Sequence, residues 1–367
     1  MHPLEGLKVV ELARILAGPW IGQSLADLGA NVVKVESPDG DDTRKWGPPF
    51  IERDGDRTAA YYYCANRGKD CVTADFRTPA GQQIVRDLVK DADILIENFK
   101  VGGLAKYGLD YGCLSALNPR LIYCSVTGFG QDGPWAKRAG YDFLLQGLSG
   151  LMSVTGDPQG HPQKVGVAIT DIVTGLYGTI GILAAVEQRH RTGHGQHVDM
   201  SLLDCATAMM ANQAMNFLAT GTSPNRMGNE HPNIAPYQAC PVRDGYIILA
   251  VGNDGQFQRF CEVIGRNDLA KDARFATNQD RVANRADLTP QIEAALANRS
   301  MADILIALED ATVPAGPINT MEQTFANPQI QHRNMQIAPD GVPGVRGPWV
   351  FSDAELNLER SAPILPK

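Results

Sequence analysis

The most apolar stretch of the chain reads Lys164-Val-Gly-Val-Ala-Ile-Thr-Asp171-Ile-Val-Thr-Gly-Leu-Tyr-Gly-Thr-Ile-Gly-Ile-Leu-Ala-Ala-Val186, and it contains a single acidic residue, Asp171. A membrane-spanning helix needs about 20 apolar residues without an internal charge, and the run from Asp171 to Glu187 is shorter than that. Three glycines at positions 175, 178 and 181 offer small faces against which another element can pack closely. The stretch therefore predicts a buried core helix.

Two roles for Asp171 follow from its place near the start of this helix. Asp is a common N-cap residue, so it could cap the helix. Alternatively, a carboxylate between apolar walls could be a nucleophile or a base, because it is partly desolvated while the helix N-terminus keeps it ionised. One residue can hold both roles.

Composition and charge narrow the class of protein. The chain has 367 residues, enough for two domains with sizeable cores, and 44% of them are hydrophobic. A formal net charge of -8 argues against non-specific nucleic-acid binding. Seven cysteines without a CxxC pair indicate reduced thiols, and the N-terminus is not of the signal-peptide type. We expect a cytoplasmic protein that binds neither nucleic acid nor membranes.

The N-terminal half alternates between strand and helix patterns. Residues 7–12 predict a strand, residues 20–28 a helix with Pro19 near its first turn, and residues 31–36 a second strand. The turn after the first strand contains no GxGxxG, so a nicotinamide-dependent dehydrogenase receives little support. The pattern continues with a helix over 79–90 opened by Thr78 and with strands over 92–97 and 121–126.

Ligands of open α/β sheets bind at the carboxyl ends of the strands. Residues at such ends are Leu16, Glu36, Ser37, Asn98, Phe99 and Gly128. Basic residues occur in the loops nearby, namely Arg44, Lys45, Arg67, Lys69, Lys100, Lys106, Lys137 and Arg138. Singly, each is best interpreted as a solvated surface charge, but together they could hold phosphates.

The C-terminal half predicts a second domain. Residues 201–227 favour a long connecting helix and a linker, and residues 244–251 a hairpin arm turning at Gly245. Gly252-Asn-Asp-Gly255 predicts a flexible loop leading into a helix at Gln256. Helical segments fill residues 269–308, and the tail after residue 328 is strand-like.

The spacing of His190, His194, His197 and Asp199 could suggest a metal site. A different interpretation is stronger, because His190 lies in the last turn of a helix among arginines and Gly193 is the expected stop. His197 then begins a strand. We predict no metal site.

Several motifs occur in a specific order along the chain: Gly-Leu-Lys-Val-Val-Glu-Leu followed by Ala17-Gly18-Pro19, Leu28-Gly-Ala-Asn-Val-Val-Lys-Val-Glu36, Glu97-Asn-Phe99, Gly140-Tyr-Asp142, Asp171 with Gly175, and Arg191-Thr-Gly-His-Gly-Gln196. Together they resemble the family III CoA-transferases, the group of formyl-CoA transferase and carnitine CoA-transferase, from residue 4 to about residue 366. Three further segments, residues 40–49, 231–238 and 316–319, resemble most the branch that includes succinate–hydroxymethylglutarate (glutarate) CoA-transferase.

The resemblance implies an α/β fold with a Rossmann-like large domain and a smaller α+β domain, in a homodimer whose chains interlock as linked rings. The implied boundaries are a CoA-binding large domain over 1–200, a linker helix and connection over 201–228, a small domain over 229–325, and a return to the large domain over 326–367. Relatives continue with a Gly-Glu-His-Thr segment and a terminal helix, so the chain resembles a truncated member.

The resemblance also implies a mechanism without metal or permanent cofactor, with coenzyme A or acyl-CoA as substrate. Asp171 would attack the donor thioester to give a mixed anhydride, and the CoA thiolate would then form an aspartyl-CoA thioester for the acceptor carboxylate. Such a carboxylate must stay ionised while shielded from water. The implied catalytic residues are Asp171, Tyr141, Asp142, and Gly252 and Gly255 of a glycine loop that closes over the intermediate. The implied CoA contacts are Leu16, Ala17, Ser37, Asn66, Arg67, Gly68, Lys69, Asn98, Phe99, Lys100, Lys106, Ala139 and Gly140.

Two departures from the family pattern bear on the substrate. Leu16 replaces the glutamine of formyl-transferring members, which weakens an assignment to formyl or oxalyl transfer. Ser37 replaces an arginine, which suggests that Arg44 shares the phosphate load. We expect succinyl-CoA as donor and a C4 to C6 dicarboxylate such as glutarate as acceptor. The candidates for binding its distal carboxylate are Arg138, Arg226 and His231.

Two alternatives remain beside the transferase. An α-methylacyl-CoA racemase needs acid/base groups on both faces of Cα, and its Gly-His-Asp motif is replaced here by Gly140-Tyr141-Asp142. An unperturbed tyrosine with a pKa of about 10 is a poor base at neutral pH. A non-catalytic CoA-binding protein would have no need of an acid at position 171. The transferase is therefore favoured.

Overall fold

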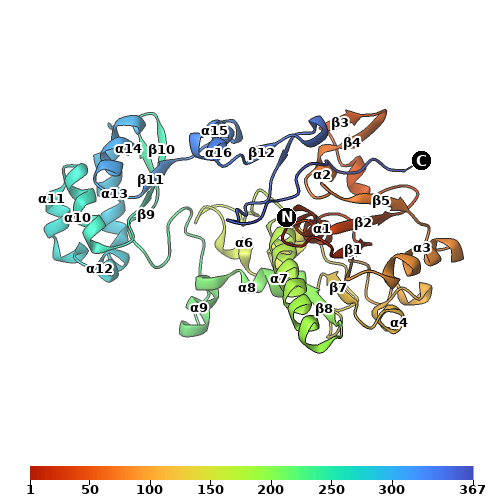
Figure 1. Ribbon diagram of the computed structural model, residues 1–367. Coiled ribbons are helices and arrows are strands. Elements are labelled where there is room, and N and C mark those ends of the chain that lie inside the picture. The colour runs from red at the N-terminus through yellow and green to blue at the C-terminus, as the bar shows by residue number, and fades with distance from the viewer. Residues whose placement is uncertain (367) are drawn as a thin grey trace. The chain divides into compact units, whose positions relative to one another are not determined.

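The computed structural model describes residues 1–366 and divides into two compact units (Figure 1). The first unit comprises Met1–Leu151, Lys164–Thr222 and Asn327–Lys367, and the second comprises Met152–Gln163 and Ser223–Ala326. This division places residues 152–163 in the second unit, whereas the sequence analysis assigns them to the large domain.

A six-stranded parallel sheet forms the centre of the first unit. In spatial order its strands are β5 (Asp70–Thr73), β2 (Asn31–Glu36), β1 (Lys8–Glu11), β6 (Ile94–Glu97), β7 (Ile122–Thr127) and β8 (His197–Ser201). The expected α/β fold with a parallel sheet is thus confirmed. The strands at its centre, β6 and β7, are short and largely apolar runs, as expected when both faces of a parallel sheet are covered.

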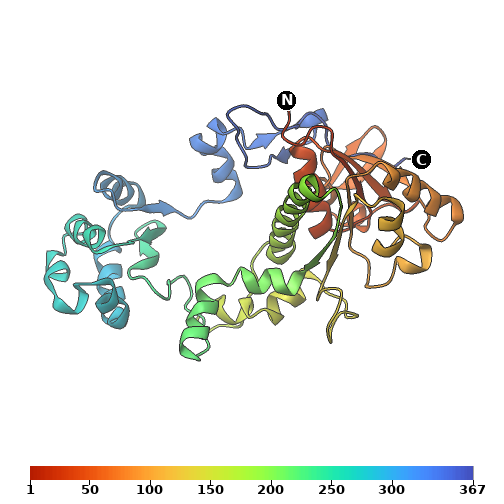
Figure 2. The ribbon, with the colours of Figure 1, turned by 60° about the horizontal axis from the view of Figure 1, so that its bottom comes forward.

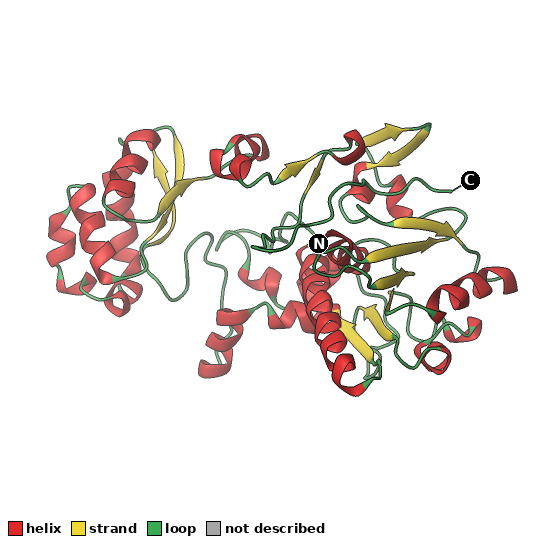
Figure 3. Cartoon of the chain, viewed as in Figure 1, coloured by secondary structure: helices red, strands yellow, loops and turns green. Residues whose placement is uncertain are grey.

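Helices cover both faces of this sheet (Figure 3). One face is packed by α1, Ala17–Asp27, and by α7, Ile169–Thr192. The other face is packed by α3, Pro79–Lys90, and by α4, Tyr111–Leu117. Successive residues of β1 belong to the two opposite cores, as the side-chain period of a strand requires.

The core helix α7 packs directly on α1 (Figure 2). A Cβ atom added at Gly175 would lie 2.8 Å from Trp20 Cδ1, and one added at Gly178 would lie 2.5 Å from Ile21 Cδ1. The glycines therefore set the close approach of the two helices, as predicted. Within residues 1–366, α7 is the one helix whose length and composition would allow a membrane span, but half of its most apolar window is buried in the unit.

Several local signals predict the ends of helices correctly. Thr78 Oγ1 accepts a hydrogen bond from the Gly81 N–H at 3.1 Å at the start of α3. Gly193 ends α7 in the left-handed region with φ of 78°. The predicted long helix over 201–227 is wrong, because the chain breaks it into α8 (Leu202–Ala208) and α9 (Ala211–Thr220) at Ala211, whose φ is 41°.

Shorter elements complete the first unit. They are β3 (Phe50–Arg53), β4 (Asp56–Ala59), α2 (Ala60–Tyr63), α5 (Asp142–Leu148), α16 (Pro328–His332), β12 (Gln336–Ile337) and β13 (Gly344–Val345). The tail after residue 328 thus begins with a helix and continues with two short strands. The segment α6 (Leu151–Val154) lies where the first unit gives way to the second.

The second unit packs helices on a three-stranded antiparallel sheet of order β11-β10-β9. The strands are β9 (Tyr237–Val242), β10 (Gly245–Ala250) and β11 (Ala315–Pro317), and the helices are α10 (Asp254–Val263), α11 (Asn267–Lys271), α12 (Asn278–Ala283), α13 (Arg285–Leu296), α14 (Met301–Asp310) and α15 (Met321–Ala326). The expected loop before α10 is shorter than predicted, because Asn253 caps the helix and Gly255 lies within its first turn.

Substituting Gly178 by alanine is expected to destabilise the protein by about 1–3 kcal/mol, because the new methyl group would wedge α7 away from Ile21. Urea unfolding of the two proteins measures this difference. Gly112→Ala in α4 is the matched control, since its methyl group meets only an ordinary contact at 3.5 Å. Equal losses in both variants would contradict the proposed helix contact.

Candidate active site at the carboxyl edge of the parallel sheet

A cavity of about 420 Å³ opens at the carboxyl ends of β1, β6 and β7. Ten of the residues that the resemblance implies as CoA contacts or catalytic groups line it: Leu16, Ala17, Asn98, Phe99, Lys100, Lys106, Ala139, Gly140, Tyr141 and Asp171. These residues come from four separate parts of the chain. The parallel topology brings them together, because it places the carboxyl ends of the strands at one edge of the sheet.

Asp171 is the third residue of α7, and Ala168 occupies the N-cap position. The N-cap alternative for Asp171 is therefore wrong. The Thr170 N–H donates instead to Asp142 Oδ1 at 2.8 Å, so a carboxylate from α5 satisfies the start of α7. Asp142 also accepts a hydrogen bond from Gln146 Nε2 at 2.8 Å, which holds it in place.

The carboxyl group of Asp171 is buried, with 9% of the residue exposed. Burial, and then the negative charge of Asp142, raise the pKa of Asp171 to about 7. A helix N-terminus favours an anion by only ~0.3–1 kcal/mol at an exposed site. Burial thus outweighs the helix start, so the expectation that the helix N-terminus keeps Asp171 ionised holds only at pH values above its raised pKa of about 7.

Tyr61 is a neighbour of Asp171 that the sequence analysis missed. Burial raises the pKa of the Tyr61 phenol to about 12, with further contributions from Cys64, Asp171 and Asp142. Its ring packs edge-on against Trp46 at a centroid distance of 5.3 Å. Nothing in the run Ala60-Tyr-Tyr-Tyr63 distinguishes Tyr61 from its neighbours, because only the fold brings its phenol under the influence of the two carboxylates.

A close backbone contact positions the segment from Ala139 to Asp142. A Cβ atom on Gly128 would lie 2.7 Å from Gly140 Cα, and one on Gly140 would lie 2.5 Å from Gly128 Cα. Only a pair of glycines allows this approach. The end of β7 thereby supports the segment that carries Tyr141 and Asp142.

Four cationic side chains line the cavity, from Arg14, Lys100, Lys106 and Arg138. Arg14 was missed from the sequence, where it lies in the loop after the first strand. Its guanidinium lies 5.6 Å from the Phe99 ring centroid and 3.2 Å from Asp42, on a half-exposed surface. Arg138 lies over the Trp135 ring at 4.3 Å. The arrangement suits a ligand that carries several negative charges.

Five predicted CoA contacts do not line this cavity: Ser37, Asn66, Arg67, Gly68 and Lys69. Lys69 Nζ is fully buried and donates to Glu11, to the Pro19 and Ala65 carbonyls, and to Asn66 Oδ1. Arg67 pairs with Asp27 at 2.6 Å. Ser37 Oγ donates to the Gly40 carbonyl, and the Gly68 N–H to the Ser361 carbonyl. Their polar groups are engaged inside the unit.

The prediction that Arg44 shares a phosphate load is wrong. Its guanidinium is buried and binds Glu36 through two hydrogen bonds, at 2.8 and 2.7 Å. Burial alone would raise the pKa of Glu36, but Arg44 and Lys34 lower it to about 2. A buried carboxylate needs such a partner, so Arg44 is structural.

Four other predicted residues lie in the second unit. The Gly252 N–H donates to Gln256 Oε1 at 2.7 Å, and Gly255 lies in α10. Arg226 donates to the carbonyls of Asp157 and Gly160, and the His231 ring lies 5.2 Å from the Tyr237 ring. Of the three candidates for binding a distal carboxylate, Arg138 therefore lines the cavity of the first unit.

The histidine spacing that could suggest a metal corresponds to other contacts. His197 Nε2 lies 2.9 Å from Ser125 Oγ, and Asp199 accepts a hydrogen bond from the Gln131 N–H. Across residues 1–366, no three His, Cys, Asp or Glu side chains group in a way that could hold a metal ion.

Comparison with known proteins was made with the whole chain. Residues 4–366 match the model of CoA-transferase family III. The chain is 54% identical to a succinate–glutarate CoA-transferase of Agrobacterium fabrum, over 99% of this chain and 93% of that protein. It is 38% identical to a succinyl-CoA:glutarate CoA-transferase of Mus musculus, over 100% of this chain and 84% of that one.

The fold of this chain is similar to that of a solved structure. A CAIB/BAIF family protein from Brucella suis superposes with a TM-score of 0.90 at 60% identity, covering 99% of this chain and 96% of that chain.

The raised pKa of Asp171 has a consequence for stability. Between pH 3.8 and about 7 the folded state binds more protons at this group than the unfolded state, so this carboxyl lowers the free energy of unfolding as pH rises. We expect Asp171→Asn to be more stable than the parent above about pH 7, by on the order of a few kcal/mol, and the difference to vanish below about pH 4.

Thermal and urea unfolding across this pH range test the expectation. Asp268→Asn is the control, because Arg266 lowers the pKa of that exposed carboxyl and its removal brings no such gain. An Asp171→Asn protein no more stable than the parent in mildly alkaline buffer would contradict the analysis.

Proposed function

Because the chain belongs to CoA-transferase family III, we propose that it transfers CoA from succinyl-CoA to glutarate or a similar short dicarboxylate. One observation carries the proposal: the buried carboxyl of Asp171 opens onto a cavity lined by four cations. The names of the similar proteins from Agrobacterium fabrum and Mus musculus support this choice of donor and acceptor.

The proposed reaction begins at Asp171. Its ionised oxygen attacks the carbonyl carbon of succinyl-CoA, the carbon–sulfur bond breaks, and CoA leaves as a thiolate. The thiolate then attacks the Asp171 carbonyl of the mixed anhydride, which releases succinate and leaves an aspartyl-CoA thioester. Glutarate attacks that thioester to form a second anhydride, and the released thiolate attacks its glutaryl carbonyl. Glutaryl-CoA forms and the Asp171 carboxylate is regenerated.

The cavity supplies what this sequence of steps needs. Burial around Asp171 excludes water, which would otherwise hydrolyse either anhydride. CoA carries a diphosphate and a further phosphate, which suit Arg14, Lys100, Lys106 and Arg138. The proposed contacts of the pantetheine arm and thioester are Leu16, Ala17, Phe99, Ala139 and Gly140. CoA is a substrate here, and the proposed chemistry uses neither a metal nor a permanent cofactor.

The glycine loop remains part of the proposal. Gly252 and Gly255 belong to the second unit, Gly252 just before α10 and Gly255 in its first turn, and we propose that this segment is the glycine loop implied by the resemblance. A Cβ atom added at either glycine would meet its nearest neighbour at 3.4 or 3.5 Å.

We also propose a homodimer with interlocked chains. Helices α5 and α7 pack together and present a row of exposed apolar side chains, namely Phe143, Leu144, Leu148, Leu176, Tyr177 and Ile180. A soluble monomer rarely exposes so continuous an apolar face. A second copy would cover it. The seven free thiols support a reducing, cytoplasmic location for the assembly.

Trapping the intermediate tests the mechanism. The protein is incubated with succinyl-CoA, quenched with hydroxylamine and analysed by peptide mass spectrometry. A hydroxamate at position 171, absent from Asp171→Asn, is expected together with glutaryl-CoA when glutarate is present. An unmodified Asp171 with deuterium incorporation at Cα of a 2-methylacyl-CoA would replace the transferase by a racemase.

Acceptor chemistry provides a second readout in the same assay. Butyrate has the same reactive end as a short dicarboxylate but lacks the distal carboxylate. Glutarate should exceed butyrate in kcat/KM by ~10²-fold or more, because a site built for a charged group rejects an analogue without it. Equal rates would remove the dicarboxylate from the proposal.

Ile180→Glu is expected to convert the dimer to monomer, because it places a charge at the centre of the apolar face. Light scattering coupled to size exclusion measures the mass. Ile306→Glu is the matched control, since Ile180 and Ile306 are both 61% exposed and Ile306 lies in the second unit. A wild-type mass of one chain would contradict the homodimer.

A further inference from the structure

The loop of residues 98–103 is a thin wall between two cavities. One is the cavity that contains Asp171, and the other, of about 230 Å³, lies beside the carboxyl ends of β6 and β7. Lys100, Val101 and Gly103 line both. Phe99 packs against the core between the sheet and α3 and α4, but no residue of 98–103 is fully buried, so polar groups also help to fix the position of the loop.

One anchor is the side chain of Asn98. Its Oδ1 accepts from the Arg14 N–H at 2.9 Å, and its Nδ2 donates to the Arg14 carbonyl at 2.6 Å. Both polar atoms of this side chain are thus engaged with the backbone next to Ile15, whose φ of 72° is unfavourable for a β-branched residue. Asn98 therefore fastens the loop after β6 to the loop after β1.

The second anchor is Glu97, the last residue of β6. Only 5% of this residue is exposed, and Oε2 accepts a hydrogen bond from the Phe99 N–H at 2.8 Å. Ser125 on β7 is the register partner of Glu97, and its hydroxyl favours the charged form of this carboxyl group. The Glu97 carboxylate thereby fixes the backbone at Phe99, near the start of the loop.

The contacts of Glu97 extend into the second cavity. Ser125 Oγ lies 2.9 Å from His197 Nε2. The His197 ring is stacked on Tyr111 at 4.8 Å and meets the edge of Tyr123 at 5.5 Å. Glu97, its strand partner Ser125 and His197 therefore form a chain of neighbours that leads from the loop to a cavity wall.

Titratable groups face Glu97 from each neighbouring strand and loop. They are Tyr123 on β7, His197 and Asp199 on β8, Asp110 and Tyr111 before and in α4, and Lys100 on the loop itself. Burial, opposed by the hydrogen bonds from Ser125 and Phe99 and supported by the charge of Asp199, raises the pKa of Glu97 to about 7. The charge on this anchor thus changes near neutral pH.

We propose that Glu97 is a positioning residue for CoA, which holds the 98–103 loop in its binding geometry through Phe99 and through the chain to Ser125 and His197. Its protonation exchanges a charge-assisted hydrogen bond for a weaker neutral one and loosens the loop. The inference rests on the proposed function only in that the larger cavity binds CoA. It does not depend on which acyl group or acceptor is used.

Calorimetric titration with free CoA tests the proposal in an Asp171→Asn background, where the nucleophile no longer titrates. Glu97→Gln keeps an acceptor for the Phe99 N–H but cannot ionise. The ionisation of CoA itself is common to both proteins and cancels in the ratio of their Kd values. We expect this ratio to be about tenfold near pH 8 and to approach one near pH 6.

Two further variants separate positioning from stability. Ser125→Ala removes a hydroxyl that favours the charged form of Glu97. With Ser125→Ala in both proteins, the pH at which the Kd ratio of Glu97→Gln to its parent changes should therefore rise. Asp93→Asn is the matched control: Asp93 directly precedes the same strand and accepts the Lys8 N–H at 2.9 Å, but at the opposite end. Asp93→Asn should lower the melting temperature, and the ratio of its Kd for CoA to that of the parent should be one at both pH values.

The outcomes are distinct. A Kd ratio that is constant between these pH values overturns the positioning role, and so does the same pH-dependent ratio in Asp93→Asn. Failure of the parent protein to bind CoA at all would instead contradict the proposed function, and this inference with it.

Discussion

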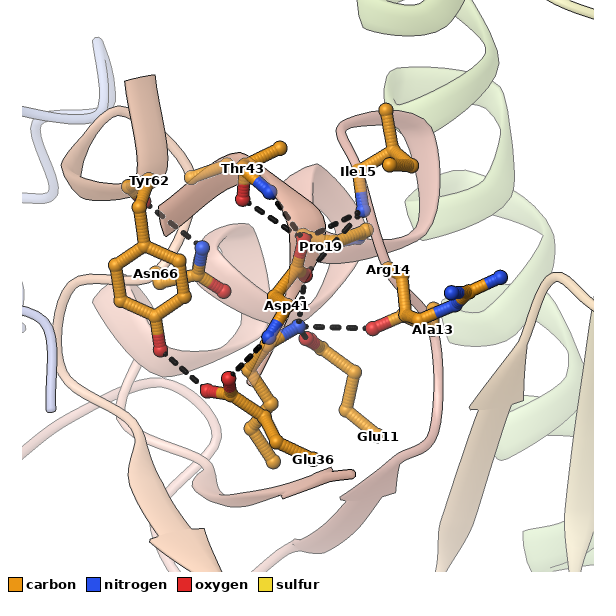
Figure 4. A network of polar contacts seen from close by, with 12 residues as sticks. Glu11, Ala13, Arg14, Ile15, Pro19, Glu36, Asp41, Thr43, Tyr62 and Asn66 are labelled. Atoms are coloured by element: carbon orange, nitrogen blue, oxygen red, sulfur yellow. Dashed lines mark hydrogen bonds and ion pairs between the residues drawn. The ribbon is translucent and has the colours of Figure 1, made fainter. Parts of the chain in front are cut away.

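The buried ion network at the carboxyl end of β1 is the constraint on which the candidate site depends (Figure 4). Lys34 Nζ lies 3.0 Å from both Glu11 and Asp41, and Lys69 Nζ lies 2.8 Å from Glu11, with the side chains of Lys34, Lys69, Glu11 and Asp41 fully buried in these pairs. Asp41 in turn accepts from the Ile15 N–H at the cavity wall. Loss of one partner would leave an uncompensated buried charge, at a cost of about 3–5 kcal/mol. The ion pairs that stabilise the first unit therefore also fix the backbone at Ile15, beside the cavity.

Charged residues of the same type have a structural role where they are buried and a binding role where they reach a cavity open to water. Arg44 and Lys69 are buried, so each must be matched by a carboxylate, and their charge does not reach a ligand. Lys100 and Lys106 lie at a cavity with access to water and can meet the phosphates of a substrate. Asp171 is the reverse case, a buried carboxyl whose neighbours disfavour its charge. Its reactivity and its cost in stability thus have a common origin.

Two loops beside the cavity are held mainly by polar contacts to backbone groups. Asn98 clamps Arg14, Glu97 holds Phe99, and Asp142 satisfies the start of α7. Each of these side chains lies at or next to the end of a regular element, where backbone groups lack partners within the element. In the motif Glu97-Asn-Phe99, the side chains of Glu97 and Asn98 therefore position the loop, and Phe99 lines the cavity.

Local signals in the sequence determined the elements and their order. Short apolar runs between helical segments predicted the strands around Val9, Val33 and Leu95. Thr78 and Gly193 predicted helix ends, because helix capping depends on a few neighbouring residues. Motif order indicated the family and made Asp171 the candidate nucleophile. Only the tertiary structure decided which cations remain available, that Asp142 accepts a hydrogen bond from the backbone at the start of α7, and that Arg14 lines the cavity. These outcomes depend on burial and on partners distant in sequence, and neither can be read from a single residue and its neighbours.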